Sequence, residues 1–142
     1  MNNSIIRLLS VNALLFCFLL STACAAGLSN VKIECIKNTL DSEKVKVDNL
    51  NQRLFIIDKN LTAQILSSKL NKIKICLKNS SWNSDWAISV FTEEKYAGYK
   101  DDKNIIPFHK NNEWAKAYKI EYLNSSGIII IDPALSPKEI KP

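Results

Sequence analysis

The residue types that carry out catalysis are sparse in this sequence. His109 is the only histidine, and the acidic pair Asp101–Asp102 lies shortly before it. A Ser-His-Asp site also needs a serine on a strained turn, and the Gly-x-Ser-x-Gly signature of that turn is absent. The pairs Glu93–Glu94 and Asp101–Asp102 are sequence neighbours, whereas glycosidase carboxyls face each other across a cleft. We therefore predict a protein that is not an enzyme.

The cysteines indicate a structural disulfide. Of the four cysteines, Cys17 and Cys24 lie within the first 26 residues, which leaves Cys35 and Cys76. A redox-active pair normally has the spacing Cys-x-x-Cys, and one histidine with two paired cysteines is too few for a zinc site. We predict a Cys35–Cys76 disulfide that stabilises the fold by about 4 kcal/mol in the chain-entropy model, and no metal or cofactor.

Residues 1–26 have the three parts of an export signal. Arg7 supplies a positive charge, residues 8–20 are almost wholly apolar, and small residues follow up to Ala26. The apolar run is shorter than the roughly 20 residues that span a membrane. We expect a signal peptide over residues 1–26 and a single mature domain over residues 27–142, located in the periplasm or secreted.

The end of this signal also resembles a bacterial lipoprotein signal. In that alternative, Cys24 of the segment Leu20-Ser21-Thr22-Ala23-Cys24 is acylated and anchors the domain to a membrane surface. Lipoprotein signals usually carry a leucine-like residue three places before the cysteine, and this position holds Ser21. We expect membrane contact only if Cys24 is acylated.

The charge balance argues against nucleic acid as a partner. The chain has 19 Lys+Arg and 14 Asp+Glu, and the charges are interspersed along it. A nucleic-acid-binding domain would show a basic stripe with interleaved aromatic residues, and this chain has none. The densest basic cluster is Lys69, Lys72, Lys74 and Lys78.

Hydrophobic periodicity predicts more strands than helices. One amphipathic helix is indicated over residues 61–73 by Leu61, Ile65, Leu66, Leu70 and Ile73. Period-two alternation or short apolar runs predict strands. These are residues 31–35, 44–48, 54–57, 73–78, 86–91, 119–123 and 128–131, with turns at residues 38–42 and 124–127.

Two segments do not fit this scheme cleanly. Residues 114–123 match a helical stripe as well as a strand face, and the predicted strands place Cys35 and Cys76 on faces of opposite polarity. The proline-containing residues 134–142 are expected to form an extended, mobile tail. We predict an α+β fold, with an antiparallel sheet of about five to six hairpin-connected strands, one or two packed helices, and one disulfide-stapled domain.

Aromatic residues in loop-like sequence suggest a recognition surface. Tyr96 and Tyr99 flank a small Ala-Gly pair, and Lys100 and Asp101 follow them, while Trp82 lies in another polar loop. Tyrosine and tryptophan bury large areas with few rotatable bonds, so they are favoured interface anchors. The alternative is that these rings fill the core of a small sheet, which is favoured for Trp86 and Trp114.

Export, small size, a disulfide and loop aromatics together predict a non-catalytic protein that binds a partner protein of the cell envelope. Inhibitors of envelope enzymes and immunity proteins are of this type. The alternative is binding of a small molecule, lipid or glycan in a pocket lined by Trp82, Trp86 and Trp114. A hydrolase is a third interpretation, and it would depend on His109.

Overall fold

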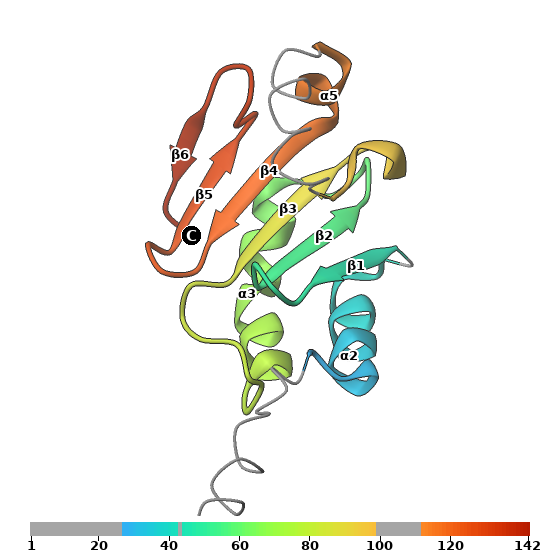
Figure 1. The fold of residues 1–142 in the computed structure, drawn as a ribbon. Coiled ribbons are helices and arrows are strands. Elements are labelled where there is room, and N and C mark those ends of the chain that lie inside the picture. The colour runs from blue at the N-terminus through green and yellow to red at the C-terminus, as the bar shows by residue number, and fades with distance from the viewer. Residues whose placement is uncertain (1–26, 43, 99–111) are drawn as a thin grey trace, which may run out of the picture.

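The protein is a single α+β domain built on a mostly antiparallel six-stranded sheet, with strand order β1-β2-β3-β4-β5-β6 (Figure 1). The computed structural model describes residues 27–42, 44–98 and 112–142. The strands are β1 (Val45–Asp48), β2 (Arg53–Ile57), β3 (Ala87–Phe91), β4 (Tyr118–Leu123), β5 (Ile128–Ile131) and β6 (Lys138–Ile140). The helices are α2 (Asn30–Leu40), α3 (Ala63–Leu77), the 3-10 helix η1 (Glu94–Tyr96) and α5 (Asn112–Ala117).

One pair of neighbouring strands is parallel. The pair β2 and β3 is joined by α3, whereas every other neighbouring pair in the sheet is antiparallel. Parallel strands need a long crossover, because the chain must return to the same end of the sheet. The expectation that all strands are hairpin-connected is therefore wrong at this point.

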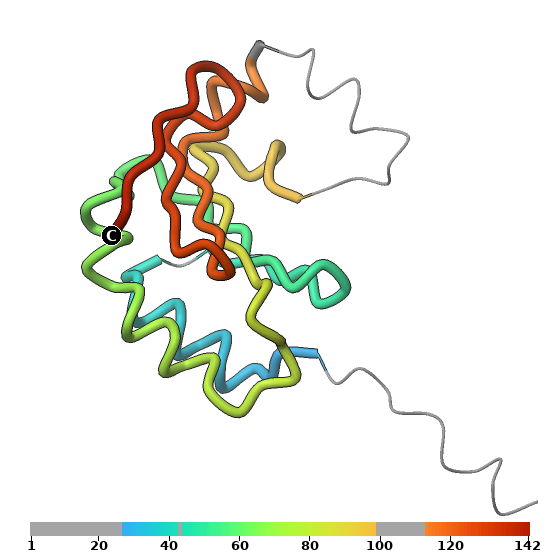
Figure 2. Tube along the Cα trace, turned by 90° about the vertical axis from the view of Figure 1, so that its left-hand side faces the viewer, coloured from blue at the N-terminus to red at the C-terminus, as the bar shows by residue number. Residues whose placement is uncertain are grey.

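The main core lies between the sheet and the helices α2 and α3, which run side by side (Figures 1 and 2). Alternate strand residues face these helices, because successive side chains of a strand point to opposite faces. The most deeply buried of them are Leu54, Ile56, Ile88, Val90, Tyr122 and Ile129, and α3 contributes Leu66 and Ile73.

A second, smaller cluster lies on the other face of the sheet. Phe55 and Phe91 of the sheet pack there with Trp114 of α5 and with Tyr118. A register shift between Val90 and Phe91 pairs Phe91 with Tyr118, and these two rings stack with centroids 4.8 Å apart. The bulge thus gives Tyr118 a place in the second cluster, although Ile120 and Tyr122 face the main core.

The strand predicted for residues 31–35 is wrong, because these residues belong to α2. The helix buries Ile36 and Leu40, which are one helical turn apart, and the alternation over Val31–Cys35 is too short to outweigh that spacing. The turn predicted from residue 38 begins later, since α2 continues to Leu40 and ends at Asp41 with a positive φ of 57°.

The strand predicted for residues 73–78 is also wrong, because α3 continues through Leu77. Ile73, Cys76 and Leu77 are buried at helical spacing, and Lys74 and Ile75 between them are exposed. Cys35 of α2 and Cys76 of α3 form the predicted disulfide, with Cα atoms 5.8 Å apart. The predicted strands place these cysteines on faces of opposite polarity. That conflict does not arise in the structure, since both cysteines lie on helices that pack together.

The ambiguous residues 114–123 divide between two elements. The helix α5 ends at Ala117, and β4 begins directly at Tyr118. The predicted tail of residues 134–142 is not simply extended, because β6 pairs with β5 and aligns Ile140 with Ile129. Pairing covers the edge that β5 would otherwise expose.

Candidate binding site

Several connections and helix ends meet at one end of the domain, which we call the turn end. It comprises the β1–β2 turn (residues 49–52), the loop at residues 78–86, the β4–β5 turn (residues 124–127), the first turn of α2 and the last turn of α3. The Leu28 amide donates to Asn49 Oδ1 at 2.8 Å, and the Asn83 amide donates to Gln52 Oε1 at 2.8 Å. The β1–β2 turn is thus tied both to the start of α2 and to the loop before β3.

The β1–β2 turn presents Leu50 to solvent on an ordered backbone. Asp48 Oδ1 accepts hydrogen bonds from the amides of Leu50 and Asn51, each at 3.1 Å, and Asp48 Oδ2 accepts one from Asn51 Nδ2 at 2.8 Å. Such carboxylate-to-backbone bonds are what makes aspartate favourable in turns. Leu50 is nevertheless 90% exposed.

Exposed apolar side chains concentrate at the turn end. Among the residues that the structure describes, the three most exposed large hydrophobic side chains are Leu50, Val31 at 80% and Ile75 at 70%. Val31 lies in the first turn of α2, and Ile75 lies in the last turn of α3. A gathering of exposed apolar groups marks an interaction surface more often than scattered single residues do.

A surface cavity of about 670 Å³ opens at the same end, between the last turn of α3 and the β4–β5 turn. This volume lies within the roughly 300–1,000 Å³ that is usual for small-molecule sites. We call it the Trp82 cavity. Its lining residues are Lys74, Ile75, Leu77, Lys78, Asn79, Ser80, Trp82, Trp86 and Asn124.

A chain of contacts fixes one side of the Trp82 cavity. The rings of Trp86 and Tyr122 are 5.5 Å apart between centroids, and the Tyr122 hydroxyl donates to Asn124 Oδ1 at 3.1 Å. Asn124 Nδ2 in turn donates to the backbone oxygen of Ser84 at 2.9 Å. The buried core of the sheet thereby positions both the β4–β5 turn and the loop that carries Trp82.

Of the described residues that line the Trp82 cavity, those with a charge are all positive. Lys74 and Lys78 are the charged residues of its lining, and Lys74 Nζ lies 5.9 Å from the centre of the Tyr122 ring. Within the described ranges, neither lysine forms an ion pair. The cavity therefore has a local excess of positive charge.

The last carbonyls of α3 also lie at this end, and they carry the negative end of the helix dipole. Lys32 of α2 donates from Nζ to the backbone oxygen of Cys76 at 3.2 Å and to that of Lys78. The positive charge of Lys32 offsets the negative end of this dipole. The dipole therefore does not neutralise the positive charges of Lys74 and Lys78.

Trp82 is half-buried and packs against the main core. Its indole Nε1 is buried, and no acceptor for this donor is found in the part of the chain that the structure describes. A buried donor without an acceptor costs about 1–3 kcal/mol. A small movement of the ring that brought this N–H to an acceptor would therefore be favourable.

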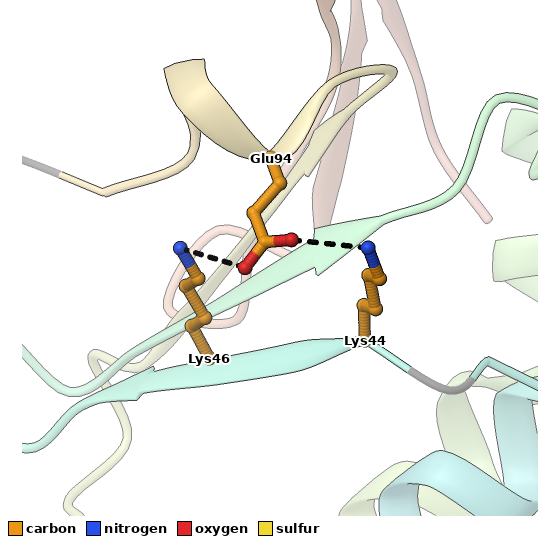
Figure 3. A network of polar contacts seen from close by, with 3 residues as sticks. All are labelled: Lys44, Lys46 and Glu94. Atoms are coloured by element: carbon orange, nitrogen blue, oxygen red, sulfur yellow. Dashed lines mark hydrogen bonds and ion pairs between the residues drawn. The ribbon is translucent and has the colours of Figure 1, made fainter.

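The opposite end of β3 carries a different set of contacts. The carboxylate of Glu94 in η1 lies between Lys44 and Lys46, with N–O distances of 3.0 and 3.3 Å (Figure 3). Hydrogen bonds from Lys44 and Lys46, with their positive charges, hold the pKa of Glu94 below its ordinary value. This contact ties η1 to the edge of the sheet, which is a structural role.

The predicted interaction surface is not assembled as expected. Trp82 precedes β3 at the turn end, whereas Tyr96 follows β3 and packs with the second cluster, so the two rings lie at opposite ends of that strand. Tyr99, Lys100 and Asp101 lie outside the described residues, as do His109 and Cys24 with the rest of the predicted signal.

The predicted aromatic pocket is assembled in part. Trp82 and Trp86 line one cavity, whereas Trp114 is buried in the second cluster on the other face of the sheet.

In the described ranges, no three His, Cys, Asp or Glu side chains come together as metal ligands. None of the helices described there is both long and apolar enough to cross a membrane.

Sequence reasoning missed Leu50, Ile75 and Asn124 as members of the site. The sequence does contain a sign that Leu50 is exposed, since this isolated leucine stands among the polar turn residues from Asp48 to Gln52. Ile75 falls on the apolar face of the strand predicted for residues 73–78, whereas the structure has it in the last turn of α3. The role of Asn124 depends on Ser84, which is 40 residues away in the sequence, and no local pattern shows such a contact.

Comparisons of the chain with protein-family models, with curated proteins and with solved structures find no match. The disulfide is typical of proteins that work outside the cytoplasm, where thiols are oxidised.

Proposed function

We propose that this protein is exported, is not an enzyme, and binds a partner protein of the cell envelope through the turn end. Inhibitors and immunity proteins act in this way. The predicted signal over residues 1–26 and the disulfide between Cys35 and Cys76 support export. The absence of a catalytic motif from the sequence supports a non-catalytic role.

The observation that carries this proposal is the position of the three most exposed large apolar side chains in the described ranges, Val31, Leu50 and Ile75. They lie on separate elements that meet at the turn end. Fully burying one such side chain is worth about 1.5–3 kcal/mol, and that gain is realised only when another surface covers it. A partner protein supplies such a surface.

The order of the β1–β2 turn also favours binding. Its hydrogen bonds to Asp48 and the Asn49 contact with Leu28 hold the turn before any partner arrives. A pre-ordered loop loses less conformational entropy on binding than a mobile one. Leu50 can therefore act as an anchor at low entropic cost.

Affinity capture tests the proposal. The tagged mature protein, obtained by expressing the full chain, is recovered from its native envelope after crosslinking, and co-purifying proteins are identified by mass spectrometry. We expect one stoichiometric protein partner, which is lost with Leu50→Ser and retained with Leu135→Ser. Leu135 is a matched control, since it is 52% exposed and follows β5 at the other end of the sheet. Equal recovery with both variants would refute binding through Leu50.

A second candidate function is binding of a small molecule, lipid or glycan. The observation that favours it is that Trp82 and Trp86 line one cavity of about 670 Å³. Envelope lipids or glycans that enter this cavity should quench or shift the tryptophan fluorescence. Trp82→Phe should reduce that change, whereas Trp114→Phe should leave it in place.

A further inference from the structure

We infer that the Trp82 cavity is a binding site for an anionic saccharide, that is, a sugar that carries a carboxylate. This inference rests on the second candidate function and names its ligand class. It does not require the partner protein. Charge, hydrogen-bonding groups and aromatic walls of the cavity each restrict what can occupy it.

The charge of the lining selects against cations. Lys74 and Lys78 line the Trp82 cavity, and no aspartate or glutamate of the described ranges is among its lining residues. Another cavity, of about 600 Å³ near the start of α3, is lined by Asp41 and Asp58 as well as by Lys59 and Lys69, so its charges balance. The excess of positive charge thus belongs to the Trp82 cavity and is not shared by this second cavity.

The lysines are available to a ligand. Neither Lys74 nor Lys78 has an ion-pair partner among the residues with described positions, whereas Lys44 and Lys46 are both bound to Glu94. Lys32 already offsets the helix dipole at the carbonyls of Cys76 and Lys78. An anion in the cavity would therefore meet a net attraction.

The uncharged part of the lining fits a sugar ring. Trp82 provides more of the aromatic wall than Trp86, which is only 5% exposed. The face of an indole is electron-rich, so the weakly positive C–H groups of a sugar pack favourably against it. Ser80, Asn79 and Asn124 add hydroxyl and amide groups, which both donate and accept hydrogen bonds as sugar hydroxyls require. A simple inorganic anion would use the lysines but would leave these walls without a partner.

Trp82 adds a donor that needs an acceptor. Its buried Nε1–H has no acceptor in the residues that the structure describes. A small rotation of the half-buried ring toward the cavity would let a sugar or carboxylate oxygen accept from it. The resulting hydrogen bond would remove the cost of the unpaired donor.

Indole resonances of the mature protein test the inference directly. The chain has three tryptophans, so three indole N–H signals are expected, and single Trp→Phe variants assign them. The probe is an oligogalacturonate, and its methyl ester is the control because esterification removes only the charge. We expect the acid to shift the signals of Trp82 and Trp86, while Trp114 stays in place because it lies in the second cluster.

The lysines are tested with a matched pair of double variants. Replacing Lys74 and Lys78 by glutamine should raise the Kd for the oligogalacturonate about tenfold, since each exposed charge contact is worth up to about 1 kcal/mol. Replacing Lys59 and Lys72 by glutamine removes the same charge away from the cavity and should change the Kd less than twofold. Added salt should weaken binding to the unmodified protein.

Three results would overturn the inference. Equal binding of the methyl ester would show that the ligand need not be an anion. Equal shifts with inorganic phosphate would show that the ligand need not be a saccharide. Unchanged Trp82 and Trp86 signals at millimolar oligogalacturonate would refute the site. None of these results affects capture of a partner through Leu50, so failure of the saccharide site and failure of partner binding are distinguishable.

Discussion

The hydroxyl of Tyr122 donates a hydrogen bond to the side-chain oxygen of Asn124 at 3.1 Å, and so a fully buried core residue positions the β4–β5 turn. Asn124 Nδ2 in turn donates a hydrogen bond to the backbone oxygen of Ser84 and so holds the loop before β3. Asn124→Ala should lower the free energy of unfolding by about 1–2 kcal/mol, because it leaves the Tyr122 hydroxyl without this acceptor. Urea denaturation measures the loss.

Ser125→Ala is the control for that experiment. Ser125 is the next residue in the same turn and is exposed, so its replacement should change the unfolding free energy by less than about 0.5 kcal/mol. If both variants unfold at the same urea concentration, Asn124 does not hold the turn to the core.

The disulfide between Cys35 and Cys76 joins α2 to α3 across 41 residues of sequence. Replacing both cysteines by alanine should lower the free energy of unfolding by about 4 kcal/mol, mainly because the unfolded chain gains entropy. Urea denaturation of the unmodified protein with reductant should show a similar loss. Labelling of both thiols by an alkylating reagent without reduction would contradict the disulfide.

The ion pairs of Glu94 predict a pH dependence at the η1 end of the sheet. Since Lys44 and Lys46 lower the pKa of Glu94 in the folded protein, their contact stabilises the fold above the ordinary carboxyl pKa. That contribution is lost as the pH falls through the lowered pKa. An NMR titration should show the pKa of Glu94 rising toward its ordinary value when both lysines are replaced by methionine.

Lys72→Met is the control for this titration, because Lys72 lies on α3 on the other face of the sheet. It should leave the pKa of Glu94 unchanged. The same pKa in the Lys44→Met, Lys46→Met double variant and in the unmodified protein would show that η1 is not held by these ion pairs.

A cross-strand ion pair lies on the face of the sheet opposite α2 and α3. Arg53 Nη1 contacts Glu121 Oε1 at 2.5 Å and Ser89 Oγ at 2.6 Å, and both charged side chains are mostly buried at 16% and 17% exposure. We expect a coupling energy of about 1–2 kcal/mol between Arg53→Met and Glu121→Gln in a double-mutant cycle. Additive effects of the two substitutions would show that the pair contributes no interaction energy.

Local sequence patterns predicted much of the sheet, because each strand from 44–48 to 128–131 shows an apolar run or an alternation of its own. These patterns gave wrong predictions where the period of a strand and the period of a helix overlap. Val31–Cys35 alternates, while Ile36 and Leu40 add a helical spacing that the packing of α2 on α3 favours. At Ile73–Leu77, burial of Cys76 against α2 extends the helix through a strand-like alternation.

The candidate site was less predictable than the fold, because it depends on contacts between distant residues. Trp82 and Trp86 are close in sequence, and both line one cavity, as the pocket alternative requires. The pocket alternative places Trp114 beside them, but the structure buries Trp114 in the second cluster on the other face of the sheet, in keeping with the core position that the sequence favours for it. The sequence groups Tyr96 with Trp82 because both are aromatic residues in loop-like segments, and that pattern does not show which end of a strand a loop occupies.

Site-specific photocrosslinking is the most direct test of binding through the turn end. A photoreactive amino acid replaces Leu50 in one variant and Leu135 in the other, and each mature protein is irradiated in its native envelope. We predict one discrete crosslinked protein from position 50 and none from position 135. The same products from both positions, or no product from position 50, would contradict the proposed function.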